Sequence, residues 1–499
     1  MSDTAATTSK PSVIKSAFRG SLVYAVPMIG QRVVSILILS VVTRVLTPSD
    51  FGMVALLEQI YSVLSVLFGV QFTSGLGYFY FQKDSERHRA GVVGTALAGA
   101  FALGTIAALV CLPFSRFIAI HVFRNIEAQR YLPLTILGMP FGFLLEALFG
   151  WLRVADRQRA FTVASLLRVV GMAGGVGVLV GVFKLHVIAY VVTWLAVIVG
   201  LCVVLGIYAM RTVRFSWSSE VFWGMLRFSL PMALSWVAMF VINFGDQFVL
   251  PHYRPLGEVG IYSLAYRIGM LVSVSISSFF TYWNAQVYQI MQREDAEPIF
   301  ARFLTYCLLL VSGCSLLLIL GARPGLRILV APAFQPAAAI VPVIVAANAM
   351  RALGEFVRTR FLADGLPKMD TYCTWVGLAV CVPSYFLLIP RYGMWGAGAA
   401  TFLTLLVMGV LSFAWTYRTR SYPIEFSRLM KLCGVSLSIG VLYYLVPVSS
   451  LVGQMAWSAL LFCGFPAGLW LLKFPTPEEW SGMRSIASRC RGWAAREAA

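Results

Sequence analysis

Charged residues are scarce in this chain, and their scarcity excludes a soluble globular protein. They make up 12% of the 499 residues, whereas hydrophobic residues make up 59%. A soluble domain usually carries about 25% charged residues. The four histidines show no metal-ligand spacing, and the nine cysteines form no Cys-x-x-Cys pair. We therefore expect neither a zinc site nor a disulfide framework, no other metal and no cofactor.

The sequence also lacks the pattern of a cleaved signal peptide and any large segment between its apolar runs. Residues 1–16 are polar and contain no apolar core before a small-residue cleavage site, so we expect no cleaved signal peptide. The segments between apolar runs are too short for a separate catalytic domain. We therefore expect that the chain is not an enzyme.

Long apolar runs dominate what is present, and each is long enough to cross a bilayer, which takes about 20 residues. They predict an all-α polytopic membrane protein with about 14 transmembrane helices. The predicted spans are 19–43, 51–75, 91–113, 131–152, 161–182, 187–209, 228–250, 259–283, 301–321, 337–357, 372–389, 393–416, 426–446 and 451–472.

An internal repeat organises these spans. Residues 19–160, shifted by 208 positions, meet a second copy of themselves without a gap. Asp50-Phe51-Gly52 falls on Glu258-Val259-Gly260, and Ala155-Asp156 falls on Ala363-Asp364. Six helices per copy give parallel repeats, and such transporters bind substrate between their halves and rock one half against the other. The repeat therefore predicts two six-helix lobes and makes transport the leading hypothesis.

The repeat also sets the expected domain boundaries. Helices 13 and 14 fall outside it, and we consider both extra packing surface and a lipid-facing groove as their role. The expected segments are an N-terminal tail 1–18, an N-lobe 19–210, a linker 211–227, a C-lobe 228–417, the two extra helices within 418–472 and a basic tail 473–499.

The net charge of +18 is explained by membrane topology rather than by nucleic-acid binding. If both termini are cytoplasmic, most Lys and Arg residues fall on cytoplasmic segments, as the positive-inside rule requires. The chain has no recognisable nucleic-acid-binding module. We therefore expect an inner-membrane protein whose basic tail lies near anionic lipid head groups.

Eight charged residues lie within the predicted spans, where each costs roughly 3 kcal/mol unless it faces a cavity or a partner. They are Arg32, Glu58, Glu146, Arg168, Asp246, Arg267, Arg351 and Glu355. Arginine offers a planar fork that matches phosphate oxygens, and carboxylates can bind a proton or a cation. We therefore predict a cavity that binds a pyrophosphate head group and sugar through Arg32, Arg168, Arg267, Arg351, Asn243 and Asn348. Glu58, Asp246 and Glu355 are the candidates for coupling to H⁺ or Na⁺.

Some of these residues have simpler interpretations that the sequence leaves open. Arg351 and Glu355 are spaced i, i+4 and can neutralise each other. Glu146 lies between Gly142 and Gly150 and can belong to a helix-packing contact. Asp50 can cap the second helix. Pro27 and Pro231 can be hinges or static kinks.

A short motif at the end of the first span identifies a family resemblance. Thr43-Arg44-Val45-Leu46-Thr47-Pro48-Ser49-Asp50-Phe51-Gly52 is similar to the Arg-x-Leu-(Gly/Thr)-Pro-x-(Asp/Glu)-(Tyr/Phe)-Gly signature of the polysaccharide-transporter branch of the multidrug/oligosaccharidyl-lipid/polysaccharide (MOP) superfamily, the O-antigen flippase type. Gly75-Leu76-Gly77, Leu362-Ala363-Asp364-Gly365 and Tyr392-Gly393-Met394-Trp395-Gly396-Ala397 are also typical of it. The resemblance covers most of residues 15–445.

The resemblance implies a flippase that moves an undecaprenyl-pyrophosphate-linked oligosaccharide to the outer leaflet by alternating access of two lobes. It implies a lipid-linked oligosaccharide and the bilayer as partners, and a polymerase or export complex as a further one. Three alternatives stay open: a multidrug/cation antiporter, disfavoured by the arginines; a membrane-embedded polymerase, ligase or glycosyltransferase; and a non-transporting scaffold. Fourteen helices exceed the 12 commonest in this branch and are similar to the number in the peptidoglycan lipid II flippases. The fuller sequence pattern of those flippases is not seen here, so lipid II is a minor option for the substrate.

Overall fold

The computed structural model describes residues 39–69, 72–73, 75–181, 183, 185–213, 215–419 and 423–476. These residues are almost entirely helical and divide into two compact units. The first consists of the described residues up to Phe240, together with Arg254–Gly260 and Leu329–Ala333. The second consists of Val241–Tyr253, Ile261–Ile328 and the described residues from Phe334 onward.

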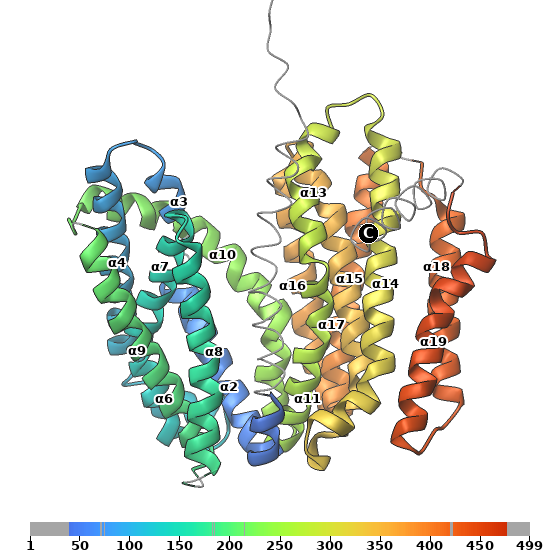
Figure 1. Cartoon of the computed structure of the whole chain (residues 1–499), viewed down its shortest axis with the longest axis horizontal. Coiled ribbons are helices and arrows are strands. Elements are labelled where there is room, and N and C mark those ends of the chain that lie inside the picture. Colours follow the sequence, from blue (N-terminus) through green and yellow to red (C-terminus); the bar gives the residue numbers. More distant parts are fainter. Residues whose placement is uncertain are drawn as a thin grey trace, which may run out of the picture. The chain divides into compact units, whose positions relative to one another are not determined.

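The first unit is a bundle of helices that run roughly alongside one another (Figure 1). Its helices are α2 (Pro48–Phe68), α3 (Gly75–Tyr80), α4 (Glu86–Cys111), α5 (Ser115–His121), α6 (Ala128–Leu137), α7 (Met139–Val154), α8 (Gln158–Gly181) and α9 (Val187–Thr212). The long helix α10 (Ser219–Val249) begins in this unit and ends in the second.

The second unit holds the remaining helices. They are η2 (Leu250–His252), α11 (Leu256–Gly269), α12 (Leu271–Ser275), α13 (Ser277–Ile290), α14 (Ala296–Leu329), η3 (Pro332–Phe334), α15 (Ala337–Ala363), α16 (Pro367–Tyr392), α17 (Met394–Thr419), α18 (Phe426–Leu445) and α19 (Leu451–Leu471). The first residues of α11 and the segment around η3 belong to the first unit.

The described helices confirm a multi-pass membrane protein. Ten are long and apolar enough to cross a bilayer, or eleven if the bent pair α6 and α7 forms one span. Thirteen of the fourteen predicted spans overlap described helices, whereas most of the first, 19–43, lies outside the described residues. The exact number of 14 spans stays a prediction.

The helix boundaries confirm the internal repeat. The starts of α4, α8 and α9 correspond to those of α14, α16 and α17 within two residues of the 208-residue offset. One difference lies at α6 and α7, which are bent by 44° at Gly138, whereas the equivalent α15 is one helix. Pro140 at the start of α7 has no N–H to continue the helix through this point. A Cβ on Gly138 would also overlap the Trp194 ring.

Local sequence signals explain where the helices begin. The Thr47 side chain accepts from the Asp50 N–H at 3.2 Å, and the Asp50 carboxylate accepts from the Thr47 N–H at 3.1 Å. This reciprocal pair is a capping box. Asp50 helps to cap α2, but from the third helical position, and the N-cap itself is Thr47. Ser85 caps α4 in a similar way by accepting from the His88 N–H.

Segment 215–218 and the first turns of α10 pack on the first unit. The Ser218 N–H donates to Thr95 of α4 at 2.9 Å, and a Cβ on Gly94 would lie 2.7 Å from the Ser216 carbonyl oxygen. Phe222 of α10 packs against Phe72 with their ring centroids 5.3 Å apart. Residues 219–227 of the predicted linker are therefore the first turns of a helix.

Candidate functional site

In the first unit, the predicted coupling residue Glu58 forms a hydrogen bond with a tyrosine. Glu58 of α2 accepts a hydrogen bond from the Tyr190 hydroxyl of α9. The Glu58 side chain is half-buried, so the carboxylate is solvated by a protein group inside a predicted span. Tyr190 was not predicted, because no local motif signals a tyrosine that lies 132 residues away in the sequence.

The second polar contact in this unit is an ion pair. Arg168 of α8 lies with its Nη1 3.4 Å from the Glu146 Oε1 of α7, and both side chains are 38% exposed. Glu146 therefore pairs with a charge as well as lying between two packing glycines. Partial exposure leaves the Arg168 guanidinium with donors directed elsewhere, since one Arg offers five.

In the second unit, Asp246 of α10 is fully buried. Its carboxylate accepts from the Tyr262 hydroxyl at 2.5 Å, the Thr401 hydroxyl at 3.0 Å and the Gln247 N–H at 2.8 Å. No Lys, Arg or His among the described residues lies within ion-pair distance of it. A buried carboxylate is stabilised only by pairing, by hydrogen bonds or by taking up a proton or a cation.

A second cluster lies one turn away and includes Arg351. This residue of α15 donates through Nη1 to the Asn243 Oδ1 of α10 at 2.9 Å and through Nε to the Glu355 Oε1 at 3.0 Å. The Tyr266 hydroxyl of α11 donates to the Asn243 carbonyl. Asn243 and Asp246, one turn apart on α10, therefore connect four helices of the second unit.

Other predicted site residues are placed differently. Asn348 is 2% exposed, and its side-chain amide donates to the Ile344 carbonyl of its own helix at 2.9 Å. This bond gives Asn348 a structural role in α15. Arg267 is exposed on α11. Arg32 and Pro27 lie outside the described residues, and so does the side chain of Pro231.

The structure brings together residues that sequence reasoning missed. Tyr262 of α11 and Thr401 of α17 donate to Asp246. No local sequence pattern shows that these helices contact α10. Tyr385 of α16 donates to the Ile242 carbonyl at 3.0 Å beside them. For these partners of Asp246, the sequence offered one signal: Tyr262 lies two residues after Gly260 of the repeated Glu258-Val259-Gly260 motif.

Arg360 is a further buried charge and is the one buried arginine among the described residues. Its guanidinium reaches Glu297 of α14 at 2.7 and 3.2 Å and Asp364 at 2.9 Å. Breaking such a network by removing one member costs about 3–5 kcal/mol. Arg360 therefore links α14 to α15, and these contacts include none of the predicted cavity residues.

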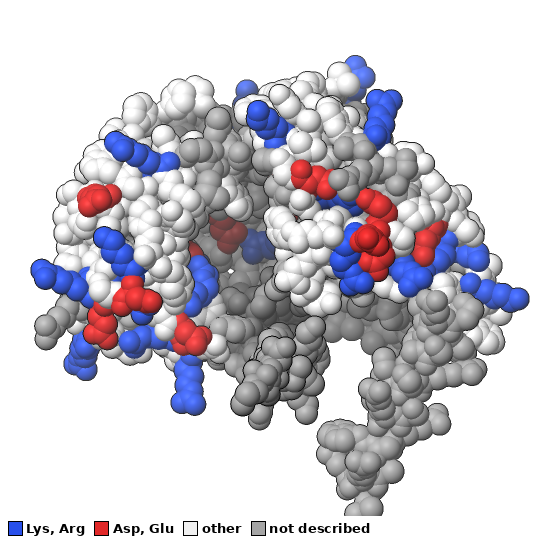
Figure 2. All heavy atoms as spheres, turned by 90° about the horizontal axis from the view of Figure 1, so that it is seen from above, with Lys and Arg blue, Asp and Glu red and all other residues white. Residues whose placement is uncertain are grey.

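Acidic and basic side chains also lie next to one another within each unit on the face seen in Figure 2.

The described residues contain no group of three or more His, Cys, Asp or Glu side chains that could hold a metal ion. Most of the described cysteines are buried, and all are free.

Comparison with known proteins identifies the family. The sequence model for the family described as "Polysaccharide biosynthesis protein" matches residues 41–339. The chain belongs to this family. No curated protein matches the chain.

Solved structures show the fold. The chain is similar to lipid II flippase MurJ in an inward closed conformation, with a TM-score of 0.74 at 13% identity, over 89% of this chain and 98% of that one. An inward-facing multidrug resistance MATE family transporter of the MOP superfamily gives 0.67 at 16% identity, over 80% and 97%. A MOP superfamily transporter from Pyrococcus furiosus gives 0.55 at 17% identity, over 80% and 94%.

These likenesses confirm the predicted fold class, that of MurJ and the MATE transporters. The solved structures are a flippase and transporters rather than enzymes, which is consistent with the prediction that the chain is not an enzyme.

Proposed function

We propose that this family member is a flippase that moves a polyprenyl-pyrophosphate-linked oligosaccharide across the bacterial inner membrane. One observation carries the proposal: a polysaccharide biosynthesis family match over residues 41–339 lies on a fold that a lipid II flippase shares over 89% of this chain. A surface polysaccharide made on a lipid carrier needs a protein that moves the carrier-linked sugar outward. Both termini are cytoplasmic in this proposal.

Partly exposed arginines within spans support an anionic substrate. Arg168 keeps part of its guanidinium exposed despite Glu146, and Arg351 is partly exposed beside Asn243. Together with Arg267 and Arg32, they supply forked donors of the kind that bind pyrophosphate oxygens. The same charges repel cationic drugs, which disfavours the antiporter alternative.

Alternating access of the two repeats would then carry the head group outward while the polyprenyl tail stays in lipid. Glu58 and Asp246 are the proposed coupling residues. A fully buried carboxylate that lacks a basic partner gains most from binding H⁺ or Na⁺, because either neutralises its charge. A polymerase or export complex would receive the product.

The deciding experiment is depletion of this protein in cells, followed by measurement of which leaflet holds the lipid-linked oligosaccharide. We expect it to accumulate with its sugar confined to the cytoplasmic leaflet. Single repeat units that reach the outer leaflet normally but fail to polymerise would instead indicate a missing enzyme. Efflux of cationic drugs that stops on depletion, with normal polysaccharide export, would indicate the antiporter.

The substrate assignment is tested by Arg168→Ala and Arg267→Ala, with Arg130→Ala as the matched control because Arg130 is exposed at the start of α6. We expect at least a tenfold loss of export in the first two variants, with normal insertion, and no loss in the control. Normal export in both substrate variants would contradict the assignment.

The coupling assignment is tested by Asp246→Asn. Asparagine keeps an oxygen that can accept from Tyr262 and Thr401 but cannot carry a negative charge, so we expect a folded protein with at least tenfold slower transport. Asp295→Asn, at an exposed position paired with Arg293, is the control. Transport in wild-type vesicles that does not change when the proton and sodium gradients are collapsed would disprove ion coupling.

A further inference from the structure

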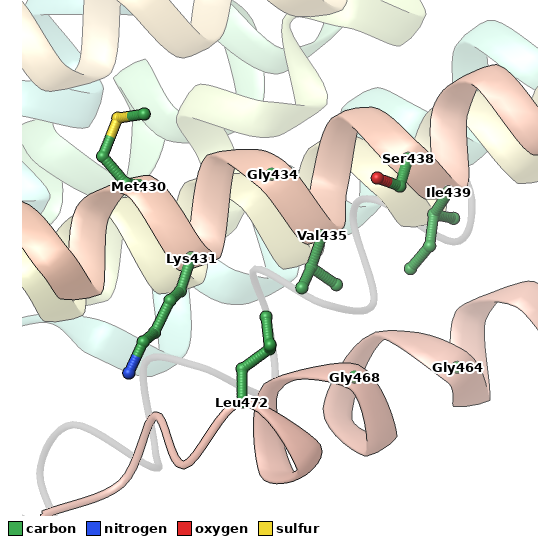
Figure 3. A pocket seen from close by; sticks show the side chains of 9 residues that line it. All are labelled: Met430, Lys431, Gly434, Val435, Ser438, Ile439, Gly464, Gly468 and Leu472. Atoms are coloured by element: carbon green, nitrogen blue, oxygen red, sulfur yellow. The ribbon is translucent and has the colours of Figure 1, made fainter.

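Helices α18 and α19 lie outside the repeat and flank a groove with a volume of about 540 Å³ (Figure 3). This size falls within the range of roughly 300–1,000 Å³ typical of small-molecule sites. Most of its lining is apolar. It is lined by Met430, Lys431, Gly434, Val435, Ser438, Ile439, Gly464, Gly468 and Leu472.

Glycines leave this groove open. A Cβ on Gly434 or on Gly464 would meet no atom within 4 Å. The helices approach at Gly468, where a Cβ would lie 3.1 Å from the Val435 Cγ1. The lining from Lys431 to Ile439 spans nine residues of α18, about 12 Å of helix. The groove is therefore long enough to take part of a hydrocarbon chain.

A single cation lies at one end of the groove. Lys431 and Leu472 mark this end, about one and a half turns into α18 (Figure 3). Lys431 is half-buried and makes no hydrogen bond or ion pair with any described residue. The acidic residue that precedes α18, Glu425, is already bonded to Arg428 at 2.9 Å and to Thr305 at 2.7 Å. No carboxylate among the residues that the structure describes therefore neutralises the Lys431 ammonium.

An apolar groove with a cation at one end complements an anionic lipid. An acyl chain in the groove would contact protein in place of neighbouring lipids, and the Lys431 ammonium would contact the lipid phosphate. The proposed topology places the start of α18 at the cytoplasmic leaflet, where anionic lipids attract basic side chains.

We propose that the groove between α18 and α19 is a binding site for an anionic phospholipid of the cytoplasmic leaflet. One acyl chain lies along Gly434 and Gly464, and the phosphate contacts Lys431. This lipid is a resident partner distinct from the transported substrate. The groove adjoins the hydrophobic cluster that joins α14, α18 and α19, since Ile439 belongs to both and Val435, which lines the groove, packs against the cluster.

The test is native mass spectrometry of the purified full-length protein titrated with dioleoyl-phosphatidylglycerol or dioleoyl-phosphatidylcholine. We expect the anionic lipid to bind more tightly. Lys431→Gln should weaken it by about fivefold, the equivalent of the roughly 1 kcal/mol that a membrane-proximal basic residue contributes. Lys431→Arg should restore it. Lys83→Gln, at an exposed position of the first unit, should have no effect.

Filling the groove gives a second measurement. Gly464→Leu should weaken binding of both lipids, whereas Gly440→Leu, also with open space at its Cβ but outside the groove, should not. Unchanged phosphatidylglycerol binding in Lys431→Gln overturns the proposal, whatever the folding of Gly464→Leu. Displacement of phosphatidylglycerol by an equimolar polyprenyl pyrophosphate also overturns it, because the groove would then belong to the transported lipid. Neither outcome affects the depletion experiment above.

Discussion

At the residue scale, the intramembrane charges divide according to what surrounds them. Asp246 is fully enclosed by hydroxyl groups and a backbone N–H. Arg168 and Arg351 are partly exposed and each has a carboxylate partner. Hydrogen bonds to a buried carboxylate stabilise it without removing its charge, so Asp246 is suited to bind a small cation or proton. Each paired arginine can neutralise its carboxylate partner or bind substrate. A double substitution of Arg351 and Glu355 distinguishes these two roles.

We predict that Arg351→Gln reduces both stability and export. It leaves the buried Asn243 side chain and Glu355 without their cation, at a cost of roughly 1–3 kcal/mol. The double variant Arg351→Gln/Glu355→Gln removes both charges together and should recover stability, measured as Tm in detergent. Export should stay at least tenfold below wild type if Arg351 binds substrate. Recovery of export in the double variant would mean that the pair only neutralises itself.

At the element scale, equivalent turns of the repeat cross at a pair of glycines. Gly52 of α2 and Gly260 of α11 are related by the 208-residue offset. A Cβ on Gly52 would overlap the Leu256 carbonyl oxygen, and a Cβ on Gly260 would overlap the Pro48 carbonyl oxygen. Since Pro48 and Leu256 are also equivalent, the crossing is symmetric. The glycine of the family-like motif is thus explained by close backbone approach.

We predict that Gly52→Ala and Gly260→Ala each destabilise the protein by about 1–3 kcal/mol, the cost of overpacking a tight contact. Neither backbone oxygen can move aside as a flexible side chain would. Gly257→Ala is the matched control on the same turn, since its Cβ would lie 3.4 Å from the Ser49 Oγ, an ordinary contact. Equal Tm values for Gly260→Ala and Gly257→Ala would show that the crossing is loose.

At the scale of the whole molecule, two compact units are built from one repeated pattern, and α10 passes from one to the other. With the predicted six spans per copy, an even number, both copies enter the membrane in the same direction, so the sidedness of one loop fixes that of the others. In the proposed topology, the loop before α4 is cytoplasmic and the loop after α5 is external.

We predict that this sidedness appears in cysteine labelling. In a background without the nine native cysteines, Glu127→Cys should react with an impermeant maleimide in intact cells. Lys83→Cys should react only after permeabilisation. Both positions are exposed in the structure, so a lack of reaction reflects the membrane rather than burial. The reverse pattern would place both termini outside the cytoplasm.

Much of the fold could be predicted from the sequence, but less of the site could. Apolar run lengths give the spans because a helix must satisfy its backbone inside lipid, and the Asp50 cap follows from a local motif. The pairing of Arg351 with Glu355 follows from i, i+4 spacing. In contrast, Tyr190 and Thr401 lie 132 and 155 residues from the carboxylates they contact, and no local pattern specifies such partners.

The sequence by itself determined that the chain crosses the membrane many times as a tandem repeat, because length, hydropathy and the 208-residue offset are properties of the chain alone. Only the tertiary structure decided how each charge is solvated: Asp246 by Tyr262 and Thr401, Arg168 by Glu146, and Lys431 by no hydrogen-bonding or charged group among the described residues. The physical reason is that a buried charge depends on side chains brought to it from other helices, and helix packing sets those neighbours.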